Sequence, residues 1–223
     1  TLFRSSVGAK NFSPLQLMET PAHWEVKRLK YVATINDETL PETTNPNTEI
    51  SYVDISSVDA SAGIVKQEEI NFENAPSRAR RIVRDGDVIV STVRTYLKAI
   101  SPIRKPPNNL IVSTGFAVVR PRSIRADYLQ YAMRESSFIE TIVSRSVGVS
   151  YPAVNVSDIE NINIPLPPIV EQQAIANFLD RTTSKIDILV TKIELSIEKL
   201  NEYRTALISA AVTGKLDLRE AVV

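Results

Sequence analysis

Residues 165–214 read PLPPIVEQQAIANFLDRTTSKIDILVTKIELSIEKLNEYRTALISAAVTG, and this stretch decides the fold of the chain. The clustered prolines at its start cannot continue a helix, and after them no glycine or proline occurs until Gly214. Gly214 stands where a helix often ends in a left-handed residue. The stretch therefore predicts one unbroken C-terminal helix of about forty residues, which at about 1.5 Å per residue is about 60 Å long.

Apolar residues recur along this predicted helix at seven-residue spacing, and Thr182 and Ser196 interrupt only the second of two rows. A rod of this length cannot fold back onto a compact domain of this size, so its apolar side needs another long helix. The alternative is a helix that lies on its own domain. We expect a coiled coil or bundle, with dimerisation through Leu179, Ile186, Leu189, Ile193, Ile197, Leu200, Tyr203 and Leu207.

Upstream of the prolines, short β-rich runs alternate with turn signals. The expected strands are Ile50–Val58, Asp87–Thr92 after the Asp85-Gly86 turn, Gly115–Arg120 and Ile162–Ile164. Short helices are expected at Ala126–Met133, from Ser137 with Glu140 as a capping box, and at a turn capped by Ser157 with Glu160. The fold class is therefore α+β: a globular mixed domain followed by a long helix.

The chain divides at the proline cluster. We assign residues 1–20 to an extension of unknown role, 21–164 to the globular domain, 165–218 to the helical region and 219–223 to a tail. With 223 residues and 43% apolar content, the chain can bury a core of its own. No stretch approaches the roughly 20 apolar residues of a membrane helix, and a cytoplasmic location without a membrane partner is expected.

The net charge is zero, but the charges are segregated along the chain. Residues 31–73 carry nine acids against one base, and residues 78–145 carry thirteen bases against five acids. Binding to phosphate depends on such local fields, so the basic stretch favours a nucleic-acid partner. The alternative is that the two stretches are neighbours in space and neutralise each other.

The sequence offers little for catalysis. Cysteine is absent, and His23 is the single histidine, so neither a thiolate site nor a histidine-rich metal site can be built. No glycine-rich nucleotide-binding motif occurs among the six glycines. Glu25-Val26-Lys27 resembles the E-x-K of some nucleases, but no suitable aspartate precedes it on a strand. We expect no catalytic centre, no metal and no cofactor.

Two loops are the best candidates for DNA contact, because they combine cationic and hydrogen-bonding side chains. In the first, an extended run after an apolar strand would place alternate residues on one side, beside an arginine cluster. These candidates are Arg94, Tyr96 and Lys98, with Arg78, Arg80, Arg81 and Arg84. The second loop contributes Arg145, Ser146, Ser150, Tyr151 and Asn155. The alternatives are solvated charges on a strand face and an ordinary connection.

Several motifs resemble conserved regions of type I restriction-modification specificity subunits, and the likeness runs from about Pro21 to Asp217. In the helical region they are Pro165-Leu166-Pro167-Pro168, Glu171-Gln172-Gln173, Phe178-Leu179-Asp180 and Thr213-Gly214-Lys215-Leu216. Upstream they are His23-Trp24-Glu25-Val26-Lys27-Arg28-Leu29, Asp85-Gly86-Asp87-Val88-Ile89 and Asn155-Val156-Ser157-Asp158-Ile159.

The resemblance implies a non-catalytic subunit whose target-recognition domain reads one half of a split site in double-stranded DNA. Its helices act as a spacer and dock methyltransferase subunits, and the restriction translocase joins through the complex. A full-length member has two such domains and two helical regions, whereas this chain has one of each. Two copies would then pair their helices antiparallel, unless the chain is a fragment of a longer subunit.

Two other function classes compete with this interpretation: a helical scaffold that dimerises without touching DNA, and a freestanding nuclease or methyltransferase. The missing motifs disfavour the enzyme. No rule of residue spacing predicts which bases are recognised, how long the spacer is or what residues 1–20 do.

Overall fold

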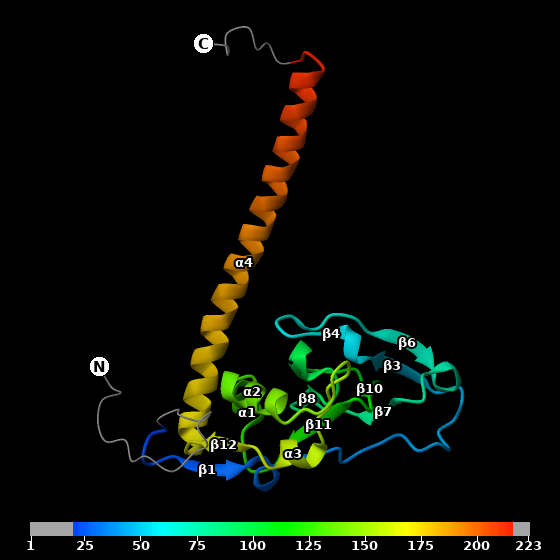
Figure 1. Cartoon of the computed structure of the whole chain (residues 1–223), viewed down its shortest axis with the longest axis vertical. Coiled ribbons are helices and arrows are strands. Elements are labelled where there is room, and N and C mark those ends of the chain that lie inside the picture. The colour runs from blue at the N-terminus through cyan, green and yellow to red at the C-terminus, as the bar shows by residue number, and fades with distance from the viewer. Residues whose placement is uncertain (1–19, 216–223) are drawn as a thin grey trace. The chain divides into compact units, whose positions relative to one another are not determined.

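The computed structural model describes residues 20–215, and the chain divides after Ala176 into two compact units (Figure 1). The first unit is a mixed domain of strands and short helices, and the second consists of the long C-terminal helix beyond Ala176. The α+β fold predicted from the sequence is confirmed. Apart from Thr20, the predicted extension and tail lie outside the described residues, and the boundary at residue 164 stays a prediction.

Two four-stranded sheets form the body of the first unit, which we call the head (residues 20–176). One sheet is antiparallel, in the order β2 (Ala33–Ile35), β11 (Phe116–Pro121), β8 (Val88–Ser91) and β9 (Ile100–Pro102). The other sheet is mixed, in the order β6 (Glu68–Asn71), β3 (Glu49–Val53), β10 (Leu110–Ser113) and β7 (Ala79–Ile82), with β3 and β10 parallel. Two small ribbons pair β1 (Glu25–Arg28) with β12 (Asn163–Leu166) and β4 (Val58–Asp59) with β5 (Gly63–Ile64).

The antiparallel sheet is the middle layer of the head, because its side chains alternate between two cores. On β8, Val88 and Val90 pack with Leu129 and the other apolar residues of the helices, whereas Ile89 points to the opposite face. There it joins a second core with Val112 of the mixed sheet. The outer face of the mixed sheet holds a third, smaller cluster around Ile111 and Tyr52. The β-rich runs of the sequence are therefore buried on both faces.

The short helices fall close to the predicted places. They are α1 (Ala126–Met133), α2 (Ser136–Ser144) and α3 (Val156–Glu160), with single 3-10 turns η1 (Leu29–Tyr31), η2 (Ile55–Ser57), η3 (Phe72–Asn74) and η4 (Thr95–Leu97). Three details of the prediction are wrong. The first turn of α2 is capped by the carboxylate of Glu135, which accepts the backbone N–H groups of Ser137 and Phe138. Helix α3 begins after Asn155, and the expected strand at residues 50–58 breaks after Val53 into η2.

Helix α4 (Ile169–Val212) begins inside the head and is fixed there by hydrogen bonds. The buried side chain of Gln172 accepts the backbone N–H of Arg125 at 2.9 Å and donates to the carbonyl of Pro167 at 2.8 Å. Glu171 accepts the indole N–H of Trp24 at 2.8 Å and contacts His23 Nε2 at 2.9 Å. Burial ends with Ala176. The single histidine therefore has a structural partner.

Beyond Ala176 the helix presents its apolar residues to solvent. The apolar seam, formed by the eight dimerisation residues predicted above, is 43–66% exposed from Ile186 to Leu207. An α-helix turns by about 100° per residue, so residues seven apart lie nearly in line along it. Two such rows of charged residues flank this seam. One consists of Lys185, Lys192 and Lys199, and the other of Asp180, Asp187 and Glu194. The helix ends as predicted at Gly214, where Lys215 N–H reaches the carbonyl of Ala210 in a Schellman arrangement.

The Asp85-Gly86-Asp87 turn fixes the start of β8 by hydrogen bonds and close packing. Gly86 has a φ of +86°, its N–H donates to the carbonyl of Ile103, and an added Cβ would lie 3.1 Å from the Cβ of Ala126. The Asp85 carboxylate accepts the backbone N–H of Lys105 at 2.6 Å. Only glycine fits this left-handed position without strain.

We expect Gly86→Ala to lower the free energy of unfolding by about 1–3 kcal/mol, because it combines a left-handed backbone with crowding against α1. Urea denaturation followed by circular dichroism measures this loss. Gly214→Ala is the matched control: its φ is +70°, but nothing lies within 4 Å of an added Cβ. The urea midpoint of the head should hardly change in the control, and equal midpoints for the two variants would contradict the expected crowding.

Candidate nucleic-acid interface

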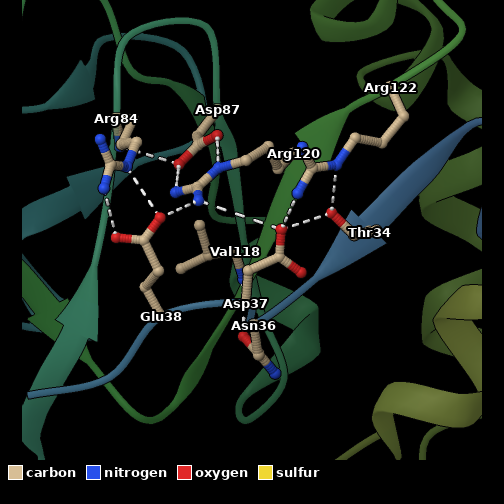
Figure 2. Close-up of polar contacts among 9 residues, drawn as sticks. All are labelled: Thr34, Asn36, Asp37, Glu38, Arg84, Asp87, Val118, Arg120 and Arg122. Atoms are coloured by element: carbon tan, nitrogen blue, oxygen red, sulfur yellow. Dashed lines mark hydrogen bonds and ion pairs between the residues drawn. The ribbon is translucent and has the colours of Figure 1, made fainter.

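The acidic and basic stretches of the chain meet in an ion-pair network around Arg120 (Figure 2). Arg120 on β11 binds both oxygens of Asp87 at 2.9 and 2.8 Å and also contacts Glu38. Glu38 accepts two hydrogen bonds from Arg84 at 2.8 and 2.7 Å. Asp37 accepts hydrogen bonds from Arg122 and Thr34, each 2.6 Å long. Part of the segregated charge is therefore neutralised inside the head, as the alternative interpretation supposed.

These contacts set the protonation of the acids. The hydrogen bonds from Arg84 are the largest cause that lowers the pKa of Glu38 from 4.5 to about 2; desolvation opposes them, and the hydrogen bond from Arg120 adds to them. The hydrogen bond from Thr34 and, less strongly, the one from Arg122 lower the pKa of Asp37. Hydrogen bonding to Asp87 raises the pKa of Arg120. Both carboxylates are consequently ionised at any pH near neutrality.

The remaining members of the arginine cluster lie on or before β7. Arg80 stacks its guanidinium 4.5 Å from the centre of the Phe72 ring and donates to the carbonyl of Ala79. Arg81 donates to Thr39 at 3.2 Å, while its Nε is buried without a hydrogen-bond partner. Arg78 is exposed directly before the strand. Arg78 and Arg80 keep accessible charge, whereas Arg84 is held by Glu38.

The first candidate loop differs from the extended run that we expected. After β8 ends at Ser91, Thr95–Leu97 form the 3-10 turn η4, and both flanking residues, Arg94 and Lys98, have left-handed backbones with φ of 51° and 52°. The three candidate side chains Arg94, Tyr96 and Lys98 therefore do not alternate along a strand. All three are nonetheless exposed.

The second candidate loop is a small hairpin held against the first. The backbone N–H groups of Val147 and Ala153 each donate to the other residue's carbonyl, at 2.8 and 3.0 Å. The N–H of Val154 donates to the carbonyl of Thr92 at 2.9 Å. We call this element the hairpin (residues 147–153). It is therefore fixed to the end of the central strand β8.

Side chains from both loops also meet directly. The guanidinium of Arg94 lies 5.0 Å from the centre of the Tyr151 ring, a cation–π contact. The hydroxyls of Thr95 and Ser146 are 2.7 Å apart, and Ser146 also donates to the carbonyl of Ile142. We name the exposed residues of this region the loop surface: Arg94, Tyr96, Lys98, Ser150 and Tyr151. The structure thus brings together two loops that were predicted separately.

Other predicted residues have internal roles. Arg145 donates to the carbonyl of Asp158 at 2.7 Å, and Asn155 occupies the position before α3 without a side-chain cap. The hydroxyl of Ser146 is partly buried in the head, where it contacts the hydroxyl of Thr95. Sequence reasoning missed Val147 and Val149, which are highly exposed on the hairpin. The alternation of Val147, Val149 and Tyr151 was the available signal.

The loop surface combines exposed cations with aromatic and hydroxyl groups, which is the chemistry suited to contact with a polyanion. Among residues 20–215, no group of three or more His, Asp or Glu side chains could hold a metal ion. In the same range, no helix is long and apolar enough to cross a membrane. Exposed cations beside aromatic and hydroxyl groups are the combination that nucleic-acid-binding modules use, and the head carries it on two adjoining loops.

The chain belongs to the type I restriction modification DNA specificity domain family, whose model matches residues 21–199. A putative type I restriction enzyme MjaX specificity subunit from Methanocaldococcus jannaschii is 26% identical over 221 residues, covering 92% of this chain and 49% of the relative. The EcoKI specificity subunit from Escherichia coli K12 is 31% identical over 100 residues, covering 44% of this chain and 22% of that protein.

Solved structures agree with this assignment. The HsdS subunit from Thermoanaerobacter tengcongensis matches with a TM-score of 0.68 and 33% identity, over 88% of this chain and 51% of that one. A chain from a study of complex assembly and conformational transition of the type I R-M system matches with a TM-score of 0.72 and 35% identity, over 86% of this chain and 50% of that one. The family resemblance seen in the sequence is confirmed, and the chain spans about half the length of its full relatives.

We expect Glu38→Gln to destabilise the head at neutral pH, because the ionised carboxylate binds two guanidinium groups. The pKa of Glu38 is lowered from 4.5 to about 2, so its contribution is complete above pH 4.5 and disappears as the pH falls towards 2. Urea midpoints across this range should therefore differ between wild type and variant at neutral pH and converge in acid. Glu42→Gln, at an exposed carboxylate nearby, is the control. A constant difference at all pH values would count against the network.

Proposed function

We propose that the chain is a non-catalytic, sequence-specific DNA-binding subunit of a type I restriction-modification system that reads one half of a bipartite site. The observation that carries the proposal is the contact of Arg94 with Tyr151, which joins the two candidate loops into one exposed surface on the head. The family match and the absence of a metal-ligand cluster among the described residues support it. Phosphate contacts from Arg94 and Lys98 would give affinity, and the hairpin would approach the base edges.

The helical region serves in this proposal as spacer and docking element. The exposed apolar seam needs a partner helix, and two copies pairing antiparallel through it would place a head at each end. Methyltransferase subunits would dock on this region, and the restriction translocase would join through the complex. The boundary between target-recognition domain and helical region is placed at residues 164 and 165. No cofactor is required, and the location is the cytoplasm, where the DNA is.

A second candidate function is a helical scaffold that does not bind DNA. The internal pairing of Arg84, Arg120 and Arg122 with Asp37 and Glu38 favours it, because these cations are no longer free for phosphate. The exposed cations of the loop surface disfavour it, because a scaffold that does not bind DNA has no need of them.

One experiment separates these functions. The purified chain is mixed with a type I methyltransferase subunit, and methylation of a random DNA library is sequenced. Methylation confined to a two-part sequence supports the proposal. Methylation by the chain alone would indicate an enzyme, and unselective methylation with the partner would indicate a scaffold.

We expect Arg94→Ala to weaken DNA binding about 5- to 100-fold or to relax the recognised sequence, because the guanidinium both contacts DNA and orders Tyr151. Its thermal unfolding should be unchanged, since the side chain is exposed. Lys66→Ala removes an exposed cation from the acidic stretch and serves as the control. Unchanged affinity and site choice in Arg94→Ala would remove Arg94 from the interface.

We expect Ile193→Asp to convert a wild-type dimer into a monomer at micromolar concentration, because it buries a charge in the centre of the seam. Sedimentation velocity measures the change. Thr191→Asp introduces the same group two residues away, on the side opposite the seam, and should leave the dimer intact. A wild-type chain that is monomeric under these conditions would contradict self-pairing.

A further inference from the structure

The hairpin is tied to the head by hydrogen bonds at its base. Two backbone hydrogen bonds close it between Val147 and Ala153, and a third ties Val154 to the end of β8 at Thr92. The contact between Ser146 and Thr95 fixes its base from the other side. Gly148, with a φ of +118°, makes the sharp bend, and an added Cβ would lie 3.1 Å from the carbonyl of Tyr151. The base of the hairpin is therefore fixed to the end of β8 and to η4.

Apolar side chains of this hairpin are open to solvent at its base and near its tip. Val149 is 101% exposed and Val147 is 79% exposed, although valine usually lies in a core or on a strand face. Tyr151, 67% exposed, lies beside them under the Arg94 guanidinium. Val149 contributes nothing to the packing of the head, and together with Val147 and Tyr151 it leaves apolar surface exposed on one short element.

The surroundings of the tip indicate what it would contact. Arg94 and Lys98 give the neighbourhood positive charge, which suits a polyanion and not a purely apolar partner. The major groove of B-DNA admits a two-stranded β-ribbon, and the hairpin, although it contains no regular strands, is likewise two chain segments wide at its Val147–Ala153 bridge. In that groove the C5-methyl group of thymine is the apolar feature at the base edges, and aliphatic side chains discriminate thymine by contact with it.

We propose that Val149 contacts the C5-methyl group of a thymine in the major groove and thereby specifies a thymine within the recognised half-site. This inference rests on the proposed DNA-reading function and adds to it a chemical feature of the substrate. Arg94 is a positioning residue for Val149. Its contact with Tyr151 holds the hairpin, and its charge faces the DNA backbone. Val149 is then a specificity-determining residue, not a contributor to the core.

The test begins with the full-length chain and a random duplex library, from which bound sequences are selected. Each thymidine of the selected half-site is then replaced singly by 2′-deoxyuridine, which removes only the methyl group. For wild type we expect one position at which the replacement weakens binding about four-fold, the value for losing one buried methyl group.

Val149→Ala should weaken binding to the thymine duplex by a similar factor, and at that same position it should be insensitive to 2′-deoxyuridine. The two changes are therefore not additive, which identifies a direct contact. Val65→Ala, at another highly exposed valine, is the matched control and should retain the full effect of the methyl group. Circular dichroism melts of both variants should match wild type, because neither side chain is buried.

Additive effects of Val149→Ala and 2′-deoxyuridine at every position would overturn the inference while leaving the proposed function intact. A selected half-site without thymine would overturn it as well. If wild type selects no sequence at all, the proposed function itself fails, and the inference fails with it. Val149→Thr keeps the side-chain volume but replaces one methyl by a hydroxyl, and it should show an intermediate sensitivity to the thymine methyl group.

Discussion

The head depends on the ion pair between Asp87 and Arg120. The Asp87 side chain is only 1% exposed, and a buried carboxylate is tolerated only when it is paired and hydrogen-bonded. Arg120 supplies two hydrogen bonds from β11, and the backbone N–H of Arg84 supplies a third. Because Arg120 also contacts Glu38, the pair ties two neighbouring strands of the middle sheet to the acidic segment that follows β2 (Figure 2).

Strand β8 connects this pair with the loop surface. Asp87 precedes its first residue, and Thr92, whose carbonyl accepts the hydrogen bond from Val154 next to the hairpin, follows its last. Between them the side chains of Val88, Ile89 and Val90 are buried in two different cores. A strand fixed at its start and packed on both faces gives the loops at its end a rigid base, as a binding surface on loops requires.

The sequence predicts those parts of the molecule whose signal is local. Helix α4 and its end at Gly214 follow from heptad spacing and the lack of interior prolines, and α1 occurs at its expected residues. The network around Arg120 was not predicted, because none of its three acidic partners lies near it in sequence. The left-handed backbones of Arg94 and Lys98 carry no sequence signal, since non-glycine residues adopt them only under tertiary constraint. The two loops of the candidate site were therefore found, but not their contact.

The charged rows on α4 make its two flanks chemically different. Lys185, Lys192 and Lys199 lie on one side of the seam, and Asp180, Asp187 and Glu194 lie on the other. The two-fold axis of an antiparallel pair runs perpendicular to both helices, so it brings equal flanks to the same side. Such a pair would carry both lysine rows along one edge and both acidic rows along the opposite edge. A parallel pair would cancel this polarity by setting each lysine row against an acidic row.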